Sequence, residues 1–261
     1  MIDQLQFNAN LTLLFSELPL LERFALAKSA GFKAVELLSN EGVDFSLLAE
    51  EVKRNELRVV LCNAPLADFP TGGSGLSGVP GRQQKFEKAI STAVEMVKTL
   101  DCEKIQIGPS RIPEDSNRNE CLSILKDNIN FAAEKLEIED LKLLIEPLNS
   151  VDIPDILLDD IEQVVALIDD CPFNNVELQL DVYHLARMEL NIEHMIEKYA
   201  EYIGHIQIAD NPGRGQPGSG KINFHSVFKA IKNTDYAGWI GAEYLPTPNT
   251  NQSLDWLNKY Q

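Results

Sequence analysis

The sequence is short of positive charge. Its 261 residues carry 23 Lys and Arg against 40 Asp and Glu, which gives a formal net charge of -17. Binding of nucleic acid without regard to its sequence depends on Lys and Arg that neutralise phosphates. We therefore expect no nucleic-acid partner. A small anionic substrate would need only a few cations placed near its site.

Cysteine is scarce, and the chain has no long apolar run. The four cysteines show neither metal-type nor redox-type spacing, which favours unpaired thiols in a reducing cytoplasm: Cys62, Cys102, Cys121 and Cys171. The first ten residues lack the basic and apolar regions of a secretory signal, and no stretch approaches the roughly 18 apolar residues of a membrane span. We expect a soluble cytoplasmic protein with no membrane partner.

What the sequence does contain is a regular alternation of short apolar runs and longer amphipathic stretches. The predicted strands are residues 5–10, 34–37, 58–63, 104–107, 141–146, 176–181, 203–209 and 239–242. The predicted helices are residues 20–30, 45–55, 83–100, 119–136, 161–168, 192–199, 224–233 and 253–259. Eight strand–helix units predict a closed parallel (β/α)8 TIM barrel, as a single domain over residues 1–261.

The alternative fold is an open, doubly wound sheet. No Gly-x-Gly-x-x-Gly follows the first predicted strand, which disfavours the dinucleotide-binding form of that fold. In a barrel, the active site is built from the carboxyl ends of the strands and the loops after them. The long loops 64–81 and 211–220 follow strands three and seven, so we expect them to cover the site or clamp a substrate.

Three apolar runs end in an acid. Glu146, Asp181 and Glu243 close the predicted fifth, sixth and eighth strands. A carboxylate after several buried positions is costly to desolvate unless it is paired or binds a cation. Each acid alone is most simply explained by a salt bridge at a strand end. Because a barrel gathers strand ends, the three together indicate a shared site.

Strand seven offers a fourth oxygen ligand. Side chains alternate along a strand, so His205, Gln207 and Ala209 share one face. If Gln207 points inward, its amide oxygen joins the three carboxylates. A ligand set of oxygens suits a hard cation such as Mg²⁺ or Mn²⁺. We therefore predict a divalent-metal site formed by Glu146, Asp181, Gln207 and Glu243.

Three further side chains are candidates for substrate contact. His184 lies just past the acid of strand six, within reach of a substrate oxygen, although a single His there is more often structural. Arg214 and Lys221 lie in the loop after strand seven and are the local cations that an anionic substrate would need. For both cations, a solvated loop charge is the simpler alternative.

These residues carry a resemblance to a known family. Residues 203–223, which read Ile-Gly-His-Ile-Gln-Ile-Ala-Asp-Asn-Pro-Gly-Arg-Gly-Gln-Pro-Gly-Ser-Gly-Lys-Ile-Asn, closely resemble the strand-seven region of hydroxypyruvate isomerases. Further matches lie in the same order at residues 31–36, 79–82, 143–149 and 179–184. The resemblance implies a xylose-isomerase-like TIM barrel and a cytoplasmic enzyme that interconverts hydroxypyruvate and tartronate semialdehyde.

The resemblance also implies residue roles. Glu146 and Glu243 match the family's acid/base pair and two of its metal ligands, and Asp181 and Gln207 match the other two. The chain departs from the family after strand three, where many relatives have His-Asn-x-Pro and this chain has Cys62 followed by Asn63. Asn63 is carried over as a substrate-binding candidate, while Cys62 leaves the exact substrate open.

Several other functions fit the same residues. Isomerisation of a longer 2-oxo sugar acid (a 2-oxo-tetronate) and 3-epimerisation of a ketose use the same metal and glutamates. A metal-dependent phosphodiesterase acting on DNA would need clustered histidines and a basic surface, but this chain has four scattered histidines. A non-catalytic metal-binding barrel is the last alternative. Oligomeric state is open, and a homo-oligomer is compatible with the sequence.

Overall fold

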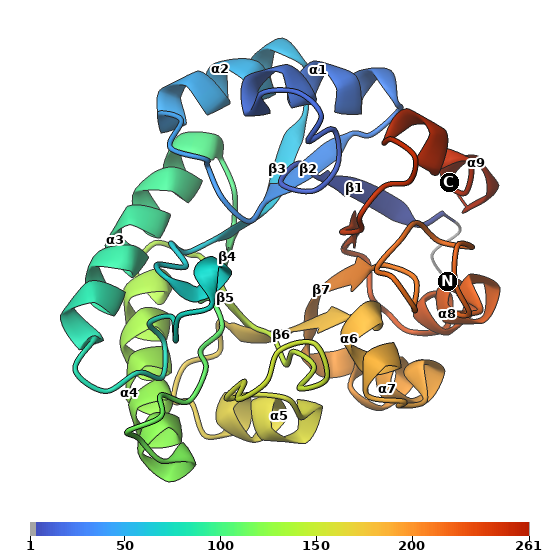
Figure 1. Ribbon diagram of the computed structural model, residues 1–261. Helices are drawn as coiled ribbons and strands as arrows, with labels where there is room; N and C mark the ends of the chain where they lie inside the picture. The colour runs from blue at the N-terminus through green and yellow to red at the C-terminus, as the bar shows by residue number, and fades with distance from the viewer. Residues whose placement is uncertain (1–3, 261) are drawn as a thin grey trace. The chain divides into compact units, whose positions relative to one another are not determined.

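The computed structural model describes residues 4–260, and its strands form one closed parallel barrel in chain order (Figure 1). The predicted TIM-barrel fold is confirmed. The strands are β1 Gln6–Asn10, β2 Ala34–Leu37, β3 Arg58–Asn63, β4 Lys104–Gln106, β5 Lys142–Ile145, β6 Val176–Asp181, β7 Ile203–Ile208 and β8 Trp239–Ala242. Four of them, β2, β3, β6 and β8, have the predicted bounds.

Helices follow the strands. They are α1 Leu20–Ser29, α2 Phe45–Arg54, α3 Gln83–Leu100, α4 Arg118–Glu137, α5 Ile161–Asp169, α6 Val182–Arg187, α7 Ile192–Lys198, α8 Phe224–Asn233 and α9 Leu257–Tyr260. The predicted bounds 83–100 and 224–233 match the structure, and those of five other helices differ by one residue at one or both ends. Two differences are larger. The helix predicted at 253–259 is instead a 3-10 turn, Asn251–Leu254, followed by α9, and the short helix α6 was not predicted. None of the described helices is both long and apolar enough to cross a membrane.

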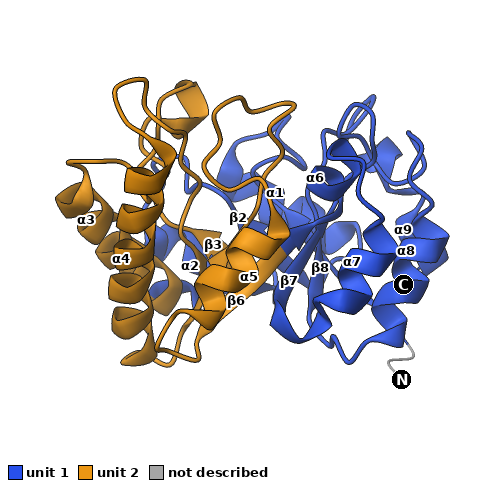
Figure 2. Ribbon diagram, turned by 90° about the horizontal axis from the view of Figure 1, so that it is seen from below, with its two compact units in different colours: residues 1–60, 99–102, 180–261 blue, residues 61–98, 103–179 orange. Residues whose placement is uncertain are grey.

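The chain divides into two compact units, coloured separately in Figure 2. Unit 1 consists of Met1–Val60, Thr99–Cys102 and Leu180–Gln261. Unit 2 consists of Leu61–Lys98 and Glu103–Gln179. Strands β1, β2, β7 and β8 belong to unit 1, strands β4 and β5 belong to unit 2, and the chain passes between the units within β3 and β6.

In unit 1, the register of the strands aligns a row of interior positions. Asn8 of β1 lies opposite Gly241 of β8, and Gln207 of β7 lies opposite the same glycine. The neighbouring residue Phe7 takes the other face of β1, where its ring meets Phe228 and Trp256 edge-on at 5.4 and 5.2 Å. Alternation along β1 thus places an aromatic side chain against the helices and an amide on the opposite face.

In unit 2, the loop after β3 is held by its own contacts. Asp68 accepts hydrogen bonds from the Gly75 N–H and from Arg82, at 3.0 and 2.8 Å. The Arg111 guanidinium lies 4.1 Å from the centre of the Phe69 ring. Beside this loop, α3 and α4 run side by side (Figure 1), and Lys135 of α4 donates to Ser91 of α3. This loop is therefore an ordered part of the fold.

Candidate active site

Two buried acids in unit 1 share one arginine. Asp181 ends β6 and Glu243 directly follows β8, and they are 1% and 5% exposed. One nitrogen of Arg214, Nη2, lies 3.3 Å from Asp181 Oδ2 and 2.6 Å from Glu243 Oε1. The His184 ring nitrogen Nε2 lies 3.5 Å from the same Asp181 oxygen. The sequence placed the two acids at strand ends, His184 just past strand six and Arg214 in the loop after strand seven. The structure brings these four side chains together.

The backbone around Asp181 explains its position. The other oxygen of Asp181 accepts a hydrogen bond from the Tyr183 N–H at 2.9 Å, so the side chain caps the N-terminus of α6. The first turns of α6 place His184 beside the acid. The Tyr183 ring lies 5.1 Å from the Arg214 guanidinium. The short helix therefore orients the acid, the histidine and the aromatic ring as one group.

The loop that carries Arg214 is organised by a single buried carboxylate. Asp210 Oδ2 accepts hydrogen bonds from the Gly218 and Gly220 N–H groups, and Oδ1 accepts one from the Ile222 N–H. The Arg214 backbone adopts the left-handed conformation, with a φ of 52°, and its carbonyl accepts a hydrogen bond from the Leu245 N–H at 2.7 Å. The glycine-rich loop is thus shaped to direct the Arg214 side chain at the acids.

Crowding of buried acids changes their protonation. Burial raises the pKa of Glu243 to about 8, and the nearby charges of Asp181 and Glu36 add to this rise. The Arg214 charge and a hydrogen bond with Gln207 lower the pKa and so oppose the rise. Burial also raises the pKa of Asp181, against the opposing charge of Arg214. Two like charges in a buried site are costly without a cation.

This protonation predicts an unusual pH dependence. The pKa of Glu243 rises from an ordinary 4.5 to about 8 on folding, so between these values the folded state holds a proton that the unfolded state has lost. The free energy of unfolding of metal-free protein should therefore fall as the pH rises from about 5 to about 8. Urea unfolding in EDTA measures it, and Glu243→Gln should reduce the slope. An unchanged slope in the variant would contradict this assignment.

A further buried acid in unit 1, Glu36 of β2, was not among the predicted site residues. It is fully buried, and its carboxylate accepts hydrogen bonds from Asn8, Asn10, His205 and Gln207. Burial raises the pKa of Glu36, but the His205 charge and the hydrogen bonds outweigh burial, so its pKa lies below the ordinary value. The sequence did contain a sign of this residue, because Glu36 is an acid inside a short strand whose other members are apolar.

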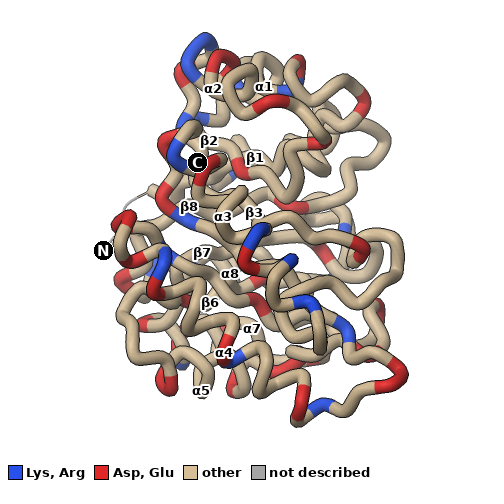
Figure 3. The backbone as a smooth tube through the Cα atoms, turned by 90° about the vertical axis from the view of Figure 1, so that its left-hand side faces the viewer, with Lys and Arg blue, Asp and Glu red and all other residues tan. Residues whose placement is uncertain are grey.

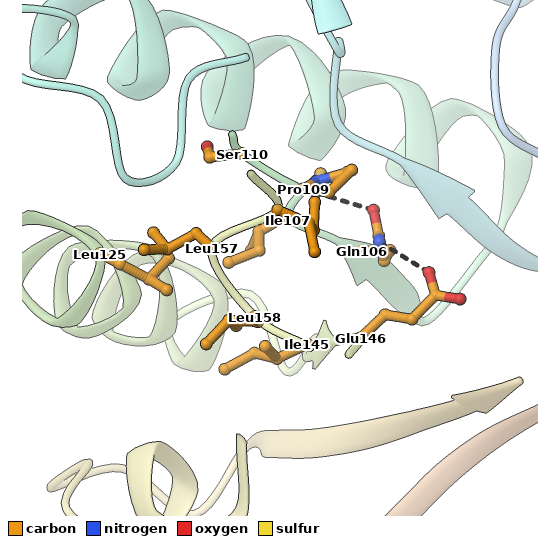
Figure 4. A pocket seen from close by; sticks show the side chains of 11 residues that line it. Gln106, Ile107, Pro109, Ser110, Leu125, Ile145, Glu146, Leu157 and Leu158 are labelled. Carbon is orange, nitrogen blue, oxygen red and sulfur yellow. Dashed lines mark hydrogen bonds between the residues drawn. The ribbon is translucent and has the colours of Figure 1, made fainter. Parts of the chain in front are cut away.

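The fourth predicted ligand, Glu146, belongs to unit 2. It directly follows β5, and its Oε2 accepts hydrogen bonds from Gln106 of β4 at 3.1 Å and from Gln179 of β6 at 2.9 Å. Figure 4 shows Gln106 between Glu146 and the turn that follows β4, where its Oε1 accepts the Gly108 N–H. These two glutamines fix the rotation of the carboxylate. Sequence reasoning missed both, because each lies within a strand of otherwise ordinary composition.

A small cavity beside Glu146 is not a substrate site. It has a volume of about 10 Å³ and is lined mainly by apolar side chains such as Leu125, Ile145 and Leu157 (Figure 4). This is about the space of one water molecule. A three-carbon acid would not fit there.

The two remaining candidates for substrate contact are Asn63 and Lys221. Asn63 ends β3 in unit 2 and is 7% exposed, and its Oδ1 has no hydrogen-bond partner among the described residues. Its neighbour Cys62 is fully buried. Lys221 lies on the exposed part of the loop after β7, where its backbone N–H donates to the Asn211 carbonyl. A buried acceptor without a partner, as in Asn63, suits a ligand hydroxyl.

The donors gathered in unit 1 fit a hard cation. Asp181 and Glu243 offer carboxylate oxygens, and Gln207 forms a hydrogen bond with Glu243 and so reaches the same place. A cationic nitrogen of Arg214 already bridges the two acids. Carboxylate and amide oxygens are the ligands that Mg²⁺ and Mn²⁺ favour.

Comparison with known proteins establishes the family. The family model described as "Xylose isomerase-like TIM barrel" matches residues 24–260. The chain belongs to this family. It is 38% identical over 257 residues to "Hydroxypyruvate isomerase" of Escherichia coli (strain K12), covering 98% of this chain and all of that one. It is 34% identical over 259 residues to "2-oxo-tetronate isomerase" of Haemophilus influenzae, covering 98% and 99% of the two chains.

A solved structure agrees with this family. The Brucella melitensis protein described as "AP endonuclease, family 2" superposes with a TM-score of 0.94 at 34% identity, over 99% of this chain and all of that one. The resemblance to hydroxypyruvate isomerases, predicted from the sequence, is confirmed. These relatives identify the chain as an enzyme of the isomerase class.

Proposed function

We propose that this enzyme interconverts hydroxypyruvate and tartronate semialdehyde (2-hydroxy-3-oxopropanoate) and depends on a divalent metal. The observation that carries the proposal is the pair of buried acids, Asp181 and Glu243, bridged by Arg214. Buried acids suit a cation, and an arginine beside them suits an anionic substrate. The relatives named as isomerases of small hydroxy-oxo acids support the choice of substrate.

Four residues would hold the metal: Glu146, Asp181, Gln207 and Glu243. Mg²⁺ and Mn²⁺ are the ions that best match three carboxylates and an amide oxygen. When bound, such an ion would stabilise the negative charge that develops on two neighbouring substrate oxygens in an enediolate. The rest of the chemistry belongs to side chains of the protein.

The reaction moves a carbonyl between adjacent carbons. One of the pair Glu146 and Glu243 removes the proton from C3, the carbon that bears the hydroxyl, and the electron pair of that C–H bond forms the C2–C3 double bond of the enediolate. The electrons of the C2 carbonyl bond move onto the C2 oxygen, which takes up the proton that the C3 hydroxyl releases. The other glutamate delivers a proton to C2, and the C3 oxygen becomes the carbonyl of the aldehyde. His184 donates a hydrogen bond to a substrate oxygen, and Asn63 and Lys221 contribute polar contacts. Either glutamate suits the first step.

Arg214 would bind the substrate carboxylate. With Asp181 and Glu243 engaged by a cation, its guanidinium becomes available to an anion. Arg214→Met should raise the KM for hydroxypyruvate by roughly 10- to 100-fold, since hydrogen bonds to charged groups contribute about 1.5–3 kcal/mol. Steady-state kinetics with Mn²⁺ measures it. Arg54→Met, which removes an exposed arginine paired with Glu51, is the matched control. An unchanged KM would remove Arg214 from substrate binding.

The closest rival functions differ in substrate. A longer 2-oxo sugar acid is supported by relatives named 2-oxo-tetronate isomerase, and a ketose 3-epimerase would use the same acids. Cys62 stands where many family members have His, and it would change the pocket if the side chain at this position contacts substrate. A panel of hydroxypyruvate, a 2-oxo-tetronate and ketoses, assayed with Mn²⁺, should give the highest kcat/KM for hydroxypyruvate. A higher value for another substrate would reassign the function.

Two further rivals are weaker. Action on DNA, one of the alternatives raised by the sequence, is also suggested by the description of the Brucella melitensis protein. The net charge of -17, with acidic residues interspersed among the basic ones in Figure 3, opposes a phosphate-binding surface. A non-catalytic metal-binding barrel would bind Mn²⁺ and leave every substrate of the panel unchanged.

A further inference from the structure

We propose that Glu36 is a positioning residue that orients the amide of Gln207 so that its oxygen, not its nitrogen, is offered to the cation. This inference rests on the proposed function, in which Gln207 is a metal ligand. Glu36 itself would not touch the ion. It would act through Gln207, from inside the barrel.

The carboxylate of Glu36 is held by four donors. Its Oε2 accepts hydrogen bonds from Asn8 Nδ2 at 2.8 Å and from His205 Nε2 at 2.7 Å. Its Oε1 accepts hydrogen bonds from Asn10 Nδ2 at 2.9 Å and from Gln207 Nε2 at 2.8 Å. The side chain is 0% exposed. With each oxygen holding two donors, the carboxylate has one fixed orientation.

The chemistry of Glu36 determines which way the Gln207 amide faces. An ionised carboxylate only accepts hydrogen bonds, so the atom that Gln207 turns toward it must be the Nε2 nitrogen. Gln207 also forms a hydrogen bond with Glu243 that lowers the pKa of that acid, so its N–H group is the donor there as well. The Oε1 oxygen of Gln207 is then the atom that neither carboxylate holds. Only this oxygen can ligate Mg²⁺ or Mn²⁺, since an amide nitrogen has no lone pair to offer a hard cation. Without an obligate acceptor, the amide could rotate and present the nitrogen.

Strand β8, which pairs with both β1 and β7, leaves room for the Glu36 carboxylate beside Gln207. Gly241 of β8 lies in register with both Asn8 and Gln207. A Cβ at Gly241 would lie 2.6 Å from Glu36 Oε1 and would overlap Oε2. Glycine at this position therefore allows the carboxylate to reach Gln207, and Gly241→Ala should displace it.

A purely structural role for Glu36 makes a different prediction. A buried acid with four donors could stabilise the barrel without any effect specific to Gln207. In that case, the loss of metal affinity on changing Glu36 would be the same whether or not Gln207 is present. A positioning role predicts that the loss disappears when Gln207 is removed, because residues that act through one another are not additive.

The test is a double-mutant cycle on Mn²⁺ affinity, measured by titration calorimetry. Glu36→Gln should weaken binding by about 10- to 100-fold, as is common for residues that orient a metal ligand. In a Gln207→Ala background, the same change should alter the affinity by less than about threefold. Glu41→Gln, which breaks the ion pair with Arg23 in the same unit, is the matched control and should leave affinity unchanged. Equal losses in both backgrounds would overturn the inference.

A readout without metal separates this inference from the proposed function. The side-chain amide resonance of Gln207, assigned by its loss in Gln207→Ala, should shift in Glu36→Gln and in Gly241→Ala. An unmoved resonance overturns the positioning role even where the wild-type protein binds Mn²⁺. Wild-type protein that binds no Mn²⁺ overturns the proposed function, and the role of Glu36 toward a cation with it. Glu36→Asp, which keeps the charge, replaces Glu36→Gln in the cycle if that variant does not fold.

Discussion

Replacing Glu243 by Gln is expected to reduce exchange of the carbon-bound hydrogens of hydroxypyruvate with deuterated water by about 10²- to 10⁴-fold, the usual contribution of a positioned acid or base. The amide keeps the size and polarity of the side chain, but it can neither take nor return a proton. It also removes one of the two acids bridged by Arg214. Proton NMR of the substrate, with Mn²⁺ present, follows the exchange directly.

The same change at Glu146 is expected to have an effect of similar size. Because Gln106 and Gln179 donate to the Glu146 carboxylate, the variant also tests whether these donors tolerate an amide. Glu41→Gln is the control, since it is a glutamate in an ion pair with Arg23. Near-normal exchange in either the Glu146 or the Glu243 variant would remove that residue from the chemistry, whereas loss in the control would indicate a general effect on folding.

Treatment with EDTA is expected to abolish isomerisation. Without a metal ion, the charges of Asp181 and Glu243 are neutralised by Arg214 and by a proton on Glu243, whose pKa is about 8. Activity should return on addition of Mn²⁺ or Mg²⁺ and should stay absent with Na⁺ alone. An assay of tartronate semialdehyde formation measures both steps. Full activity in EDTA, in protein shown by elemental analysis to be metal-free, would contradict the metal dependence.

The barrel could be predicted from the sequence because its periodicity is local. The buried run of β8 is short and apolar and is followed directly by the acid Glu243, so its bounds follow from the pattern. The short helix α6 could not be found in this way. Six residues are too few to establish a helical period, and α6 depends on the cap that the Asp181 side chain provides.

In the site, too, some residues could be predicted from the local sequence and others only from the folded structure. Acids at strand ends, such as Asp181 and Glu243, stand out in the sequence because burial of an unpaired charge is costly. The partners that orient them depend on which strands are neighbours and on their register, as with Gln106 and Gln179 around Glu146. Glu36 was missed for a related reason. Its importance appears only when two other strands, β1 and β7, direct Asn8, His205 and Gln207 toward it.

The most direct test of the central claim is one NMR time course of hydroxypyruvate in deuterated water with the Mn²⁺-loaded enzyme. We predict that deuterium enters at C3 of the substrate, that tartronate semialdehyde accumulates, and that both changes stop when EDTA is added. If the substrate instead stays unlabelled and unconverted while the protein is folded and has Mn²⁺ bound, the protein does not isomerise hydroxypyruvate.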